Sequence, residues 1–133
     1  MNKLTGNISQ IQKSGSIILV DVDVNGQCFS ALLIESATPP EWLQTNNTID
    51  LVFKETEVSL AKNLTGKISL RNRMICRVMQ IDKGILLSTI RLAFQNFILM
   101  SAITTRSVES LQISVGEEIE ALVKSNEVSL MKK

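Results

Sequence analysis

The sequence predicts an all-β protein made of two copies of one small antiparallel barrel. The first observation is a repeat: residues 54–60, with the sequence KETEVSL, recur at residues 124–130 as KSNEVSL. A chain that repeats itself once over half its length is typically two copies of one fold. The second observation is that β-branched runs punctuated by turn signals fill both halves. The third is that the last strand of each half breaks its alternation at the same place.

The repeat divides the chain into two units of similar length. Repeat 1 is expected at residues 1–65 and repeat 2 at residues 66–133. No linker rich in proline, glycine or serine separates them, so we expect the two units to be closely coupled. A unit of about 65 residues buries too little surface to be more than marginally stable alone. The two halves are therefore expected to pack on each other or on another subunit.

Hairpins account for the middle of each repeat. In repeat 1, residues 17–24 end in strict alternation, Asn25-Gly26 supplies a two-residue hairpin turn, and residues 27–34 form the returning strand. In repeat 2, residues 85–94 and 97–103 are the matching strands, with a less clear turn at Gln95-Asn96.

One short helix is expected after the second strand of each hairpin. Residues 38–41, Thr-Pro-Pro-Glu, have the pattern of a helix start, with Trp42 placed to anchor the helix on the barrel. The matching stretch of repeat 2 is residues 107–111. Both repeats then turn, through Asn46-Asn47 and Gly116, and these residue types tolerate positive φ.

The last strand of each repeat carries a lysine where the alternation breaks. Ile49 and Leu51 share one face, whereas Val58 and Leu60 have the opposite parity, so a strict strand cannot bury both pairs. A bulge or tight turn is expected between residues 54 and 57, and again between 124 and 127. Such a break frees backbone N–H groups beside a lysine, which is one way to build an anion site. The alternative is an ordinary bulge with a solvated lysine.

Composition excludes several classes of function. The 133 residues carry a net charge of +1, with 4% aromatic residues and no histidine. This balance disfavours nucleic-acid binding by charge or by base stacking. Without histidine or a nucleophile motif, no catalytic constellation is visible, so an enzyme is not expected. Cys28 and Cys76 are expected to be buried reduced thiols. No signal core or membrane span is found, and we expect a cytoplasmic protein.

Short motifs of repeat 2 resemble those of one family. Residues 69–72, Ser-Leu-Arg-Asn, resemble the Ser-Ala-Arg-Asn opening of the molybdate-binding Mop domains, the molbindins. Residues 103–107, Ile-Thr-Thr-Arg-Ser, are similar to the family's Ile-Thr-x-x-Ser stretch. Residues 124–128, Lys-Ser-Asn-Glu-Val, are similar to its Lys-Ala-Ser-Glu-Val segment, and repeat 1 echoes it at residues 54–58. In order, spacing and duplication, the resemblance covers nearly the whole chain.

The resemblance implies a five-stranded OB-like barrel in each repeat and assembly into dimers or trimers, with the oxyanion bound between subunits. The implied ligand is molybdate or tungstate, held only as the oxyanion, with no separate metal site and no organic cofactor. The implied role is molybdenum storage or homeostasis. One alternative is the ligand-sensing domain of a molybdate-responsive regulator or transporter ATPase. An alternative of another class is an OB-type module that binds protein or nucleic acid.

The resemblance also implies the binding residues. The oxygens of molybdate only accept hydrogen bonds, so a site must offer hydroxyls, N–H groups and cations. A carboxylate at Glu55, where repeat 2 has Ser125, opposes an anion, so unequal sites are expected, with repeat 2 supplying most donors. On this match the oxyanion-binding residues are Ser69, Leu70, Arg71, Asn72, Thr104, Ser107, Lys124 and Ser125 in repeat 2, and Lys54, Glu55 and Ser36 in repeat 1.

Overall fold

The fold consists almost entirely of strands. The computed structural model describes residues 1–34 and 38–133. In repeat 1 it contains β1 (Asn2–Ser14), β2 (Ile17–Val24), β3 (Gln27–Ile34), β4 (Thr48–Phe53), the 3-10 turn η1 (Glu55–Glu57) and β5 (Ser59–Ala61). In repeat 2 it contains β6 (Asn72–Lys83), β7 (Leu87–Phe94), β8 (Phe97–Thr104), helix α1 (Thr105–Leu111), β9 (Glu118–Val123), the 3-10 turn η2 (Ser125–Glu127) and β10 (Ser129–Lys132).

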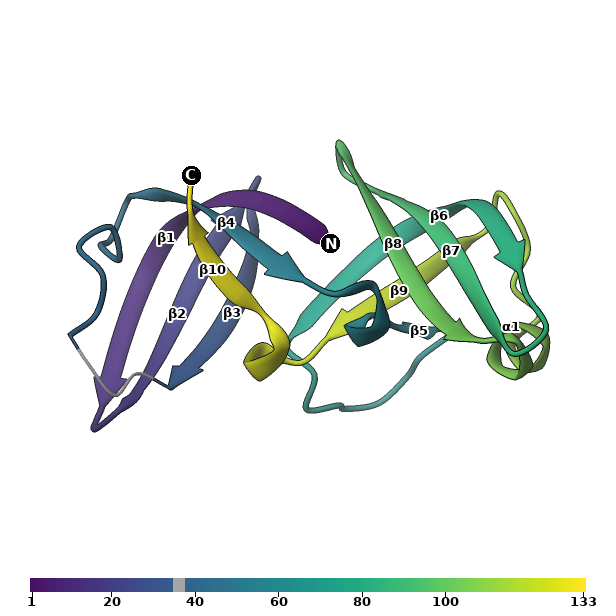
Figure 1. The fold of residues 1–133 in the computed structure, drawn as a ribbon, viewed down its shortest axis with the longest axis horizontal. Coiled ribbons are helices and arrows are strands. Elements are labelled where there is room, and N and C mark those ends of the chain that lie inside the picture. Colours follow the sequence, from purple (N-terminus) through teal and green to yellow (C-terminus); the bar gives the residue numbers. More distant parts are fainter. Residues whose placement is uncertain (35–37) are drawn as a thin grey trace.

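The strands form two five-stranded antiparallel sheets, as the all-β prediction requires. Their orders are β10-β4-β1-β2-β3 and β5-β9-β6-β7-β8. Each sheet curls around its own core, and the two lie side by side along the long axis of the molecule (Figure 1). The short strands β5 and β10 are exchanged, because each pairs with the sheet of the other repeat. The division of the sequence into two repeats therefore does not coincide with the division into two sheets.

The two sheets have the same register at an offset of seventy residues. Asn2 faces Phe53 in the first sheet, and Asn72 faces Val123 in the second. The first hairpin of each sheet has an irregularity at the same position, after Ile8 and after Val78. The molecule thus has an internal pseudo-twofold relation, with each barrel built on the same hydrogen-bonding plan.

The predicted turn residues adopt the conformations that their types favour. Asn25 and Gly26 have φ of 50° and 92°, as a tight hairpin turn requires, and Gln95 takes the same role with φ of 51°. Asn46 has φ of 76° and Gly116 has φ of 91°. The exchange of asparagine for glycine at this paired position is therefore confirmed as a shared left-handed residue.

The predicted break in the last strand is confirmed, and its form is a turn followed by a crossover. Lys54 and Lys124 are extended, and a 3-10 turn follows each of them. The turn carries the chain out of one sheet and into the other. Val58 and Val128, which have the wrong parity for the sheet they leave, are buried with exposed fractions of 1% and 5%. The parity change thus marks entry into the neighbouring barrel rather than a bulge within one strand.

The helix predicted for repeat 1 is absent from the described residues 38–47, which form turns. Residues 35–37 lie outside the described range. Two consecutive prolines explain the difference, because Pro40 disfavours helical backbone at the residue before it. The turn closes with a 3.0 Å hydrogen bond from Leu43 N to Pro40 O. Repeat 2 has no proline here, and its helix starts at Thr105, two residues earlier than expected.

The two barrels share an apolar contact at their junction. Phe29 of β3 and Phe94 of β7 meet edge to face, with ring centroids 5.9 Å apart.

Cys76 is buried as predicted, but the prediction for Cys28 is wrong, because its side chain is exposed. Cys28 lies on the outer face of the edge strand β3, where alternation places every second residue outside the core. No helix in the described residues is long and apolar enough to cross a membrane.

Candidate functional site

The turn η2 of repeat 2 lies against strand β3 of the first barrel. The hydroxyls of Ser125 and Ser30 are 2.8 Å apart, a hydrogen bond that joins residues 95 positions apart in the chain. Ser30 is buried, with an exposed fraction of 7%. Lys124 precedes this contact and is exposed. The structure therefore pairs the predicted Ser125 with a hydroxyl from the other repeat, which the sequence motifs did not indicate.

Asn72 fixes the backbone of the same strand. Its side-chain amide donates to Ser30 O at 2.9 Å and accepts from Ser30 N at 2.8 Å. Asn72 is 1% exposed. The amide thus acts as a bracket between the barrels, and both its carbonyl and its N–H₂ group are engaged. This geometry gives the predicted ligand Asn72 a structural task next to Ser125.

The residues before Asn72 lead toward the same place. Ser69 and Arg71 are exposed, and Leu70 is half-buried. The positive charge of Arg71 affects the pKa of the Cys28 thiol on β3. Partial burial of the thiol is the main factor that raises the pKa of Cys28, Asp21 raises it further, and Arg71 opposes both. Arg71 and Lys124 are thus two exposed cations that immediately precede Asn72 and Ser125 in the chain.

The pseudo-equivalent position in repeat 1 has the same bracket and different chemistry. Asn2 donates to Met100 O at 2.8 Å and accepts from Met100 N at 2.7 Å. Met100 stands where the other barrel has Ser30, and Glu55 stands where it has Ser125. The carboxylate of Glu55 accepts a hydrogen bond from the N-terminal ammonium group, and this bond is the main reason why the pKa of Glu55 is lowered.

The backbone N–H of Lys54 is also engaged in repeat 1. It donates to the Glu57 carboxylate at 2.8 Å, which closes the turn η1. Ser36, the remaining predicted site residue of repeat 1, lies outside the described residues. The hydroxyl pair is therefore formed where Ser30 meets Ser125. At the pseudo-equivalent position, the thioether of Met100 and the carboxylate of Glu55 replace these two hydroxyls.

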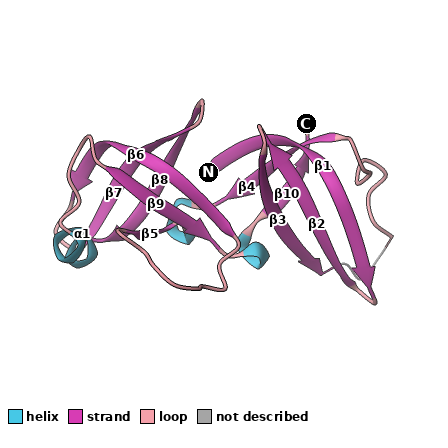
Figure 2. Ribbon diagram, turned by 180° about the vertical axis from the view of Figure 1, so that it is seen from behind, coloured by secondary structure: helices cyan, strands magenta, loops and turns pink. Residues whose placement is uncertain are grey.

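Thr104 and Ser107 lie elsewhere, at the start of α1. Thr104 Oγ1 accepts from Ser107 N at 3.1 Å, so Thr104 is the N-cap of the helix. Its hydroxyl is also 2.8 Å from the hydroxyl of Ser107. Figure 2 shows α1 at the outer end of the second barrel and the two short 3-10 turns between the barrels. Within one chain, the structure separates Thr104 and Ser107 from the group around Ser125.

Comparisons with known proteins give the family. Residues 68–130 match the family model described as the TOBE domain. A solved molybdate-binding protein from Sporomusa ovata is 36% identical over 50% of this chain and 100% of its own length, with a TM-score of 0.50. The chain belongs to the molbindin family.

A second solved structure extends the similarity to the whole fold. It is the cytoplasmic molybdate-binding protein ModG with molybdate bound, which is 22% identical, covers 99% of this chain and 96% of its own, and gives a TM-score of 0.92. At 22% identity this similarity shows a shared fold, which includes both sheets. A search of the curated proteins gave no match.

The TOBE match contains every site residue predicted in repeat 2 of this molbindin. It spans the opening segment from Ser69 to Asn72, the hydroxyls at Thr104 and Ser107, and the turn at Lys124 and Ser125. Ser30 lies outside the match, in repeat 1. Among the described residues, no group of three or more cysteine or acidic side chains is placed to hold a metal ion.

Proposed function

We propose that this molbindin binds molybdate, or the similar oxyanion tungstate, at the group formed by Ser30, Arg71, Lys124 and Ser125. The observation that carries the proposal is the 2.8 Å hydroxyl pair of Ser30 and Ser125, and the exposed cations Lys124 and Arg71 directly precede Ser125 and Asn72 in the chain. Two relatives in the same family or fold are described as molybdate-binding proteins. The proposed role is storage or homeostasis of molybdenum in the cytoplasm, by binding and release and without catalysis.

The chemistry of the group suits a fully deprotonated tetrahedral dianion. Each oxygen of such a ligand accepts hydrogen bonds, so hydroxyls and cationic N–H groups are the complementary partners. Ser125 and Ser30 each carry one hydroxyl proton, and the bond between them uses one of the two, leaving the other free to donate to a ligand. Lys124 and Arg71 supply charge. Ser69, two residues before Arg71, supplies a further hydroxyl to the group.

We propose that the ligand lies between subunits of a homo-oligomer, either a dimer or a trimer. The group around Ser125 is open on one side, because Lys124, Arg71 and Ser69 are exposed. Thr104 and Ser107 lie at the outer end of the second barrel, away from Ser125 in the same chain. The hydroxyls of Thr104 and Ser107 can contact the ligand if they come from a neighbouring subunit. The pseudo-equivalent group in repeat 1, with Lys54 and Glu55, is expected to bind more weakly because its carboxylate repels an anion.

Thermal unfolding with added oxyanions tests the proposal. A ligand present at about one hundred times its dissociation constant adds about 2.7 kcal/mol to the free energy of unfolding. Molybdate is expected to raise the unfolding temperature, whereas equal concentrations of sulfate and phosphate are not. If no oxyanion raises it while the protein remains folded, the proposed function is wrong.

Two lysine variants locate the site. Lys124→Ala removes a charge-assisted contact worth about 1.5–3 kcal/mol, so molybdate affinity measured by titration calorimetry is expected to fall about 10- to 100-fold. Lys54→Ala is the matched control, because Lys54 has the same exposure, the same extended backbone and the following 3-10 turn. Lys54→Ala is expected to lower molybdate affinity less than about threefold, which is smaller than the loss of a direct contact with the ligand. Equal losses would mean that the two pseudo-equivalent groups bind equally well, and an unchanged affinity in Lys124→Ala would place the ligand elsewhere.

A further inference from the structure

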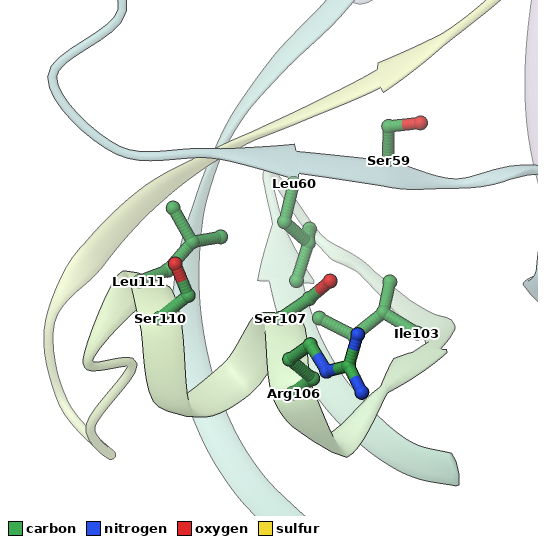
Figure 3. A pocket seen from close by; sticks show the side chains of 7 residues that line it. All are labelled: Ser59, Leu60, Ile103, Arg106, Ser107, Ser110 and Leu111. Carbon is green, nitrogen blue, oxygen red and sulfur yellow. The ribbon is translucent and has the colours of Figure 1, made fainter. Parts of the chain in front are cut away.

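A cavity of about 440 Å³ opens between the exchanged strand β5 and helix α1. Its apolar wall consists of Leu60, Ile103 and Leu111, which are partly buried and pack against the core. Figure 3 shows Leu60 entering from β5 above the helix and Ile103 closing the side. Because Leu60 belongs to repeat 1, the cavity is completed only by the strand exchange.

The polar wall of the cavity offers donors and no carboxylate. It consists of Ser59, Arg106, Ser107 and Ser110. In Figure 3 the guanidinium of Arg106 lies beside Ile103 and near the Ser107 hydroxyl. Arg106 forms no ion pair with any described residue. Glu109, which is nearby on the same helix, is instead 3.4 Å from Lys83.

The pseudo-equivalent cavity of the first barrel has a different lining among the described residues. It measures about 220 Å³, and Ser129 and Leu130 of β10 line it in place of Ser59 and Leu60. Trp42 and Pro40 occupy the side where the second barrel has helix α1 and Arg106. Among the described residues that line this smaller cavity there is no cation and one hydroxyl, that of Ser129. The two barrels of one molecule can therefore be compared directly.

We propose that the cavity at Arg106 binds a small organic anion, a carboxylate on an apolar body. Its volume falls in the range of about 300–1,000 Å³ that is usual for small-molecule sites, and its mixture of apolar wall and few polar groups is also typical. A carboxylate pairs with the guanidinium and the serine hydroxyls. The apolar body covers Leu60, Ile103 and Leu111, which an inorganic oxyanion leaves wet. The cation that anchors this ligand, Arg106, is not part of the group at Ser125, although Ser107 of the cavity wall is also proposed to reach molybdate in a neighbouring subunit.

Titration of the isotope-labelled protein with hexanoate, followed by NMR, tests the proposal. Saturable shift changes are expected at the backbone amides of Ser59, Leu60 and Ile103. Hexanol has a similar apolar body without the charge, and it is expected to bind at least tenfold more weakly. Arg106→Gln is expected to weaken hexanoate binding at least tenfold, the equivalent of about 1.4 kcal/mol. Arg91→Gln removes an exposed arginine elsewhere and is expected to leave the affinity unchanged.

Four results would overturn the proposal: no saturable change with hexanoate, equal affinity for hexanol, unchanged affinity in Arg106→Gln, or shift changes centred on Ser129 and Leu130. Trp42 is the only tryptophan and lines the other cavity, so a change in its emission reports binding there. Ser125→Ala separates the two proposals. It is expected to weaken molybdate binding and to leave hexanoate binding intact, whereas Arg106→Gln is expected to weaken hexanoate binding far more than molybdate binding.

Discussion

Replacing Asn72 by alanine is expected to lower the free energy of unfolding substantially. The substitution removes two hydrogen bonds, of 2.8 and 2.9 Å, to the backbone of Ser30. Ser30 is 7% exposed and Asn72 is 1% exposed, so water does not readily replace the lost partner. Each buried backbone group left unpaired costs about 1–3 kcal/mol. Allowing for partial relaxation, we expect a loss of about 3 kcal/mol in total, taken from the lower half of that doubled range.

Urea unfolding, followed by Trp42 fluorescence and by circular dichroism, measures this loss. For a chain of this size, about 3 kcal/mol corresponds to a fall of about 10 °C in the unfolding temperature. Asn126→Ala is the control, because Asn126 is exposed in the turn η2. Its effect is expected to stay within about 0.5 kcal/mol, as for most surface substitutions.

The pseudo-equivalent bracket provides a second check on the same reasoning. Asn2→Ala removes the matching pair of bonds to Met100, of 2.8 and 2.7 Å, so it is expected to cost a similar free energy. A loss below about 1 kcal/mol for Asn72→Ala would refute the bracket. Weaker molybdate binding with unchanged stability would instead make Asn72 a ligand, as the sequence resemblance implies.

Three further predictions concern the second barrel and the thiols. Lys62→Met removes the bonds from Lys62 Nζ to two carbonyls at the end of α1, at 3.1 and 2.9 Å, and to Glu117 at 2.9 Å. Because solvent screens these bonds, we expect the free energy of unfolding measured in urea to fall by about 1 kcal/mol. Lys132→Met, a change at an exposed lysine, should alter it little. The pKa of Glu117 is lowered below 4.5, first by the Ser114 N–H and then by Lys62. Stability from this group is therefore present above pH 4.5 and lost as the pH falls through the folded pKa, and in acid unfolding Glu117→Gln should reduce this dependence. Burial raises the pKa of Cys76 to about 12, so at pH 8 a thiol reagent should modify Cys28 alone in the folded protein and both cysteines after unfolding; two rapid reactions in the folded state would contradict the burial of Cys76.

Much of the fold was readable in the sequence because its determinants are local. The hairpin strands at residues 17–24 and 27–34 follow from alternation around Asn25-Gly26, and the structure has them at the same bounds. The parity change after Lys54 and Lys124 was also readable, because side chains alternate with a period of two. The helix predicted for repeat 1 was wrong because the second of two consecutive prolines disfavours helical backbone at the residue before it.

The predicted site was only partly assembled. The structure places Ser125 against β3, the strand to which Asn72 is hydrogen-bonded, with Lys124 directly before it. It separates Thr104 and Ser107 from them within one chain. Ser30 was missed because no motif includes it: a serine in an apolar strand has no local signal that distinguishes a partner of Ser125 from a filler of the sheet.

The sequence alone determined the repeat, the hairpin strands, the turns and the parity change, since each follows from a short local pattern that can be recognised wherever it recurs in the chain. The destination of the last strand was decided only by the tertiary structure. Val58 and Val128 had to enter an apolar core after the turn, but both cores are apolar, and parity does not distinguish one from the other. The exchange of β5 and β10 also brings Ser30 and Ser125 together across 95 residues and completes the cavity at Arg106. Contacts between residues so far apart depend on how the two barrels pack, which no local pattern encodes.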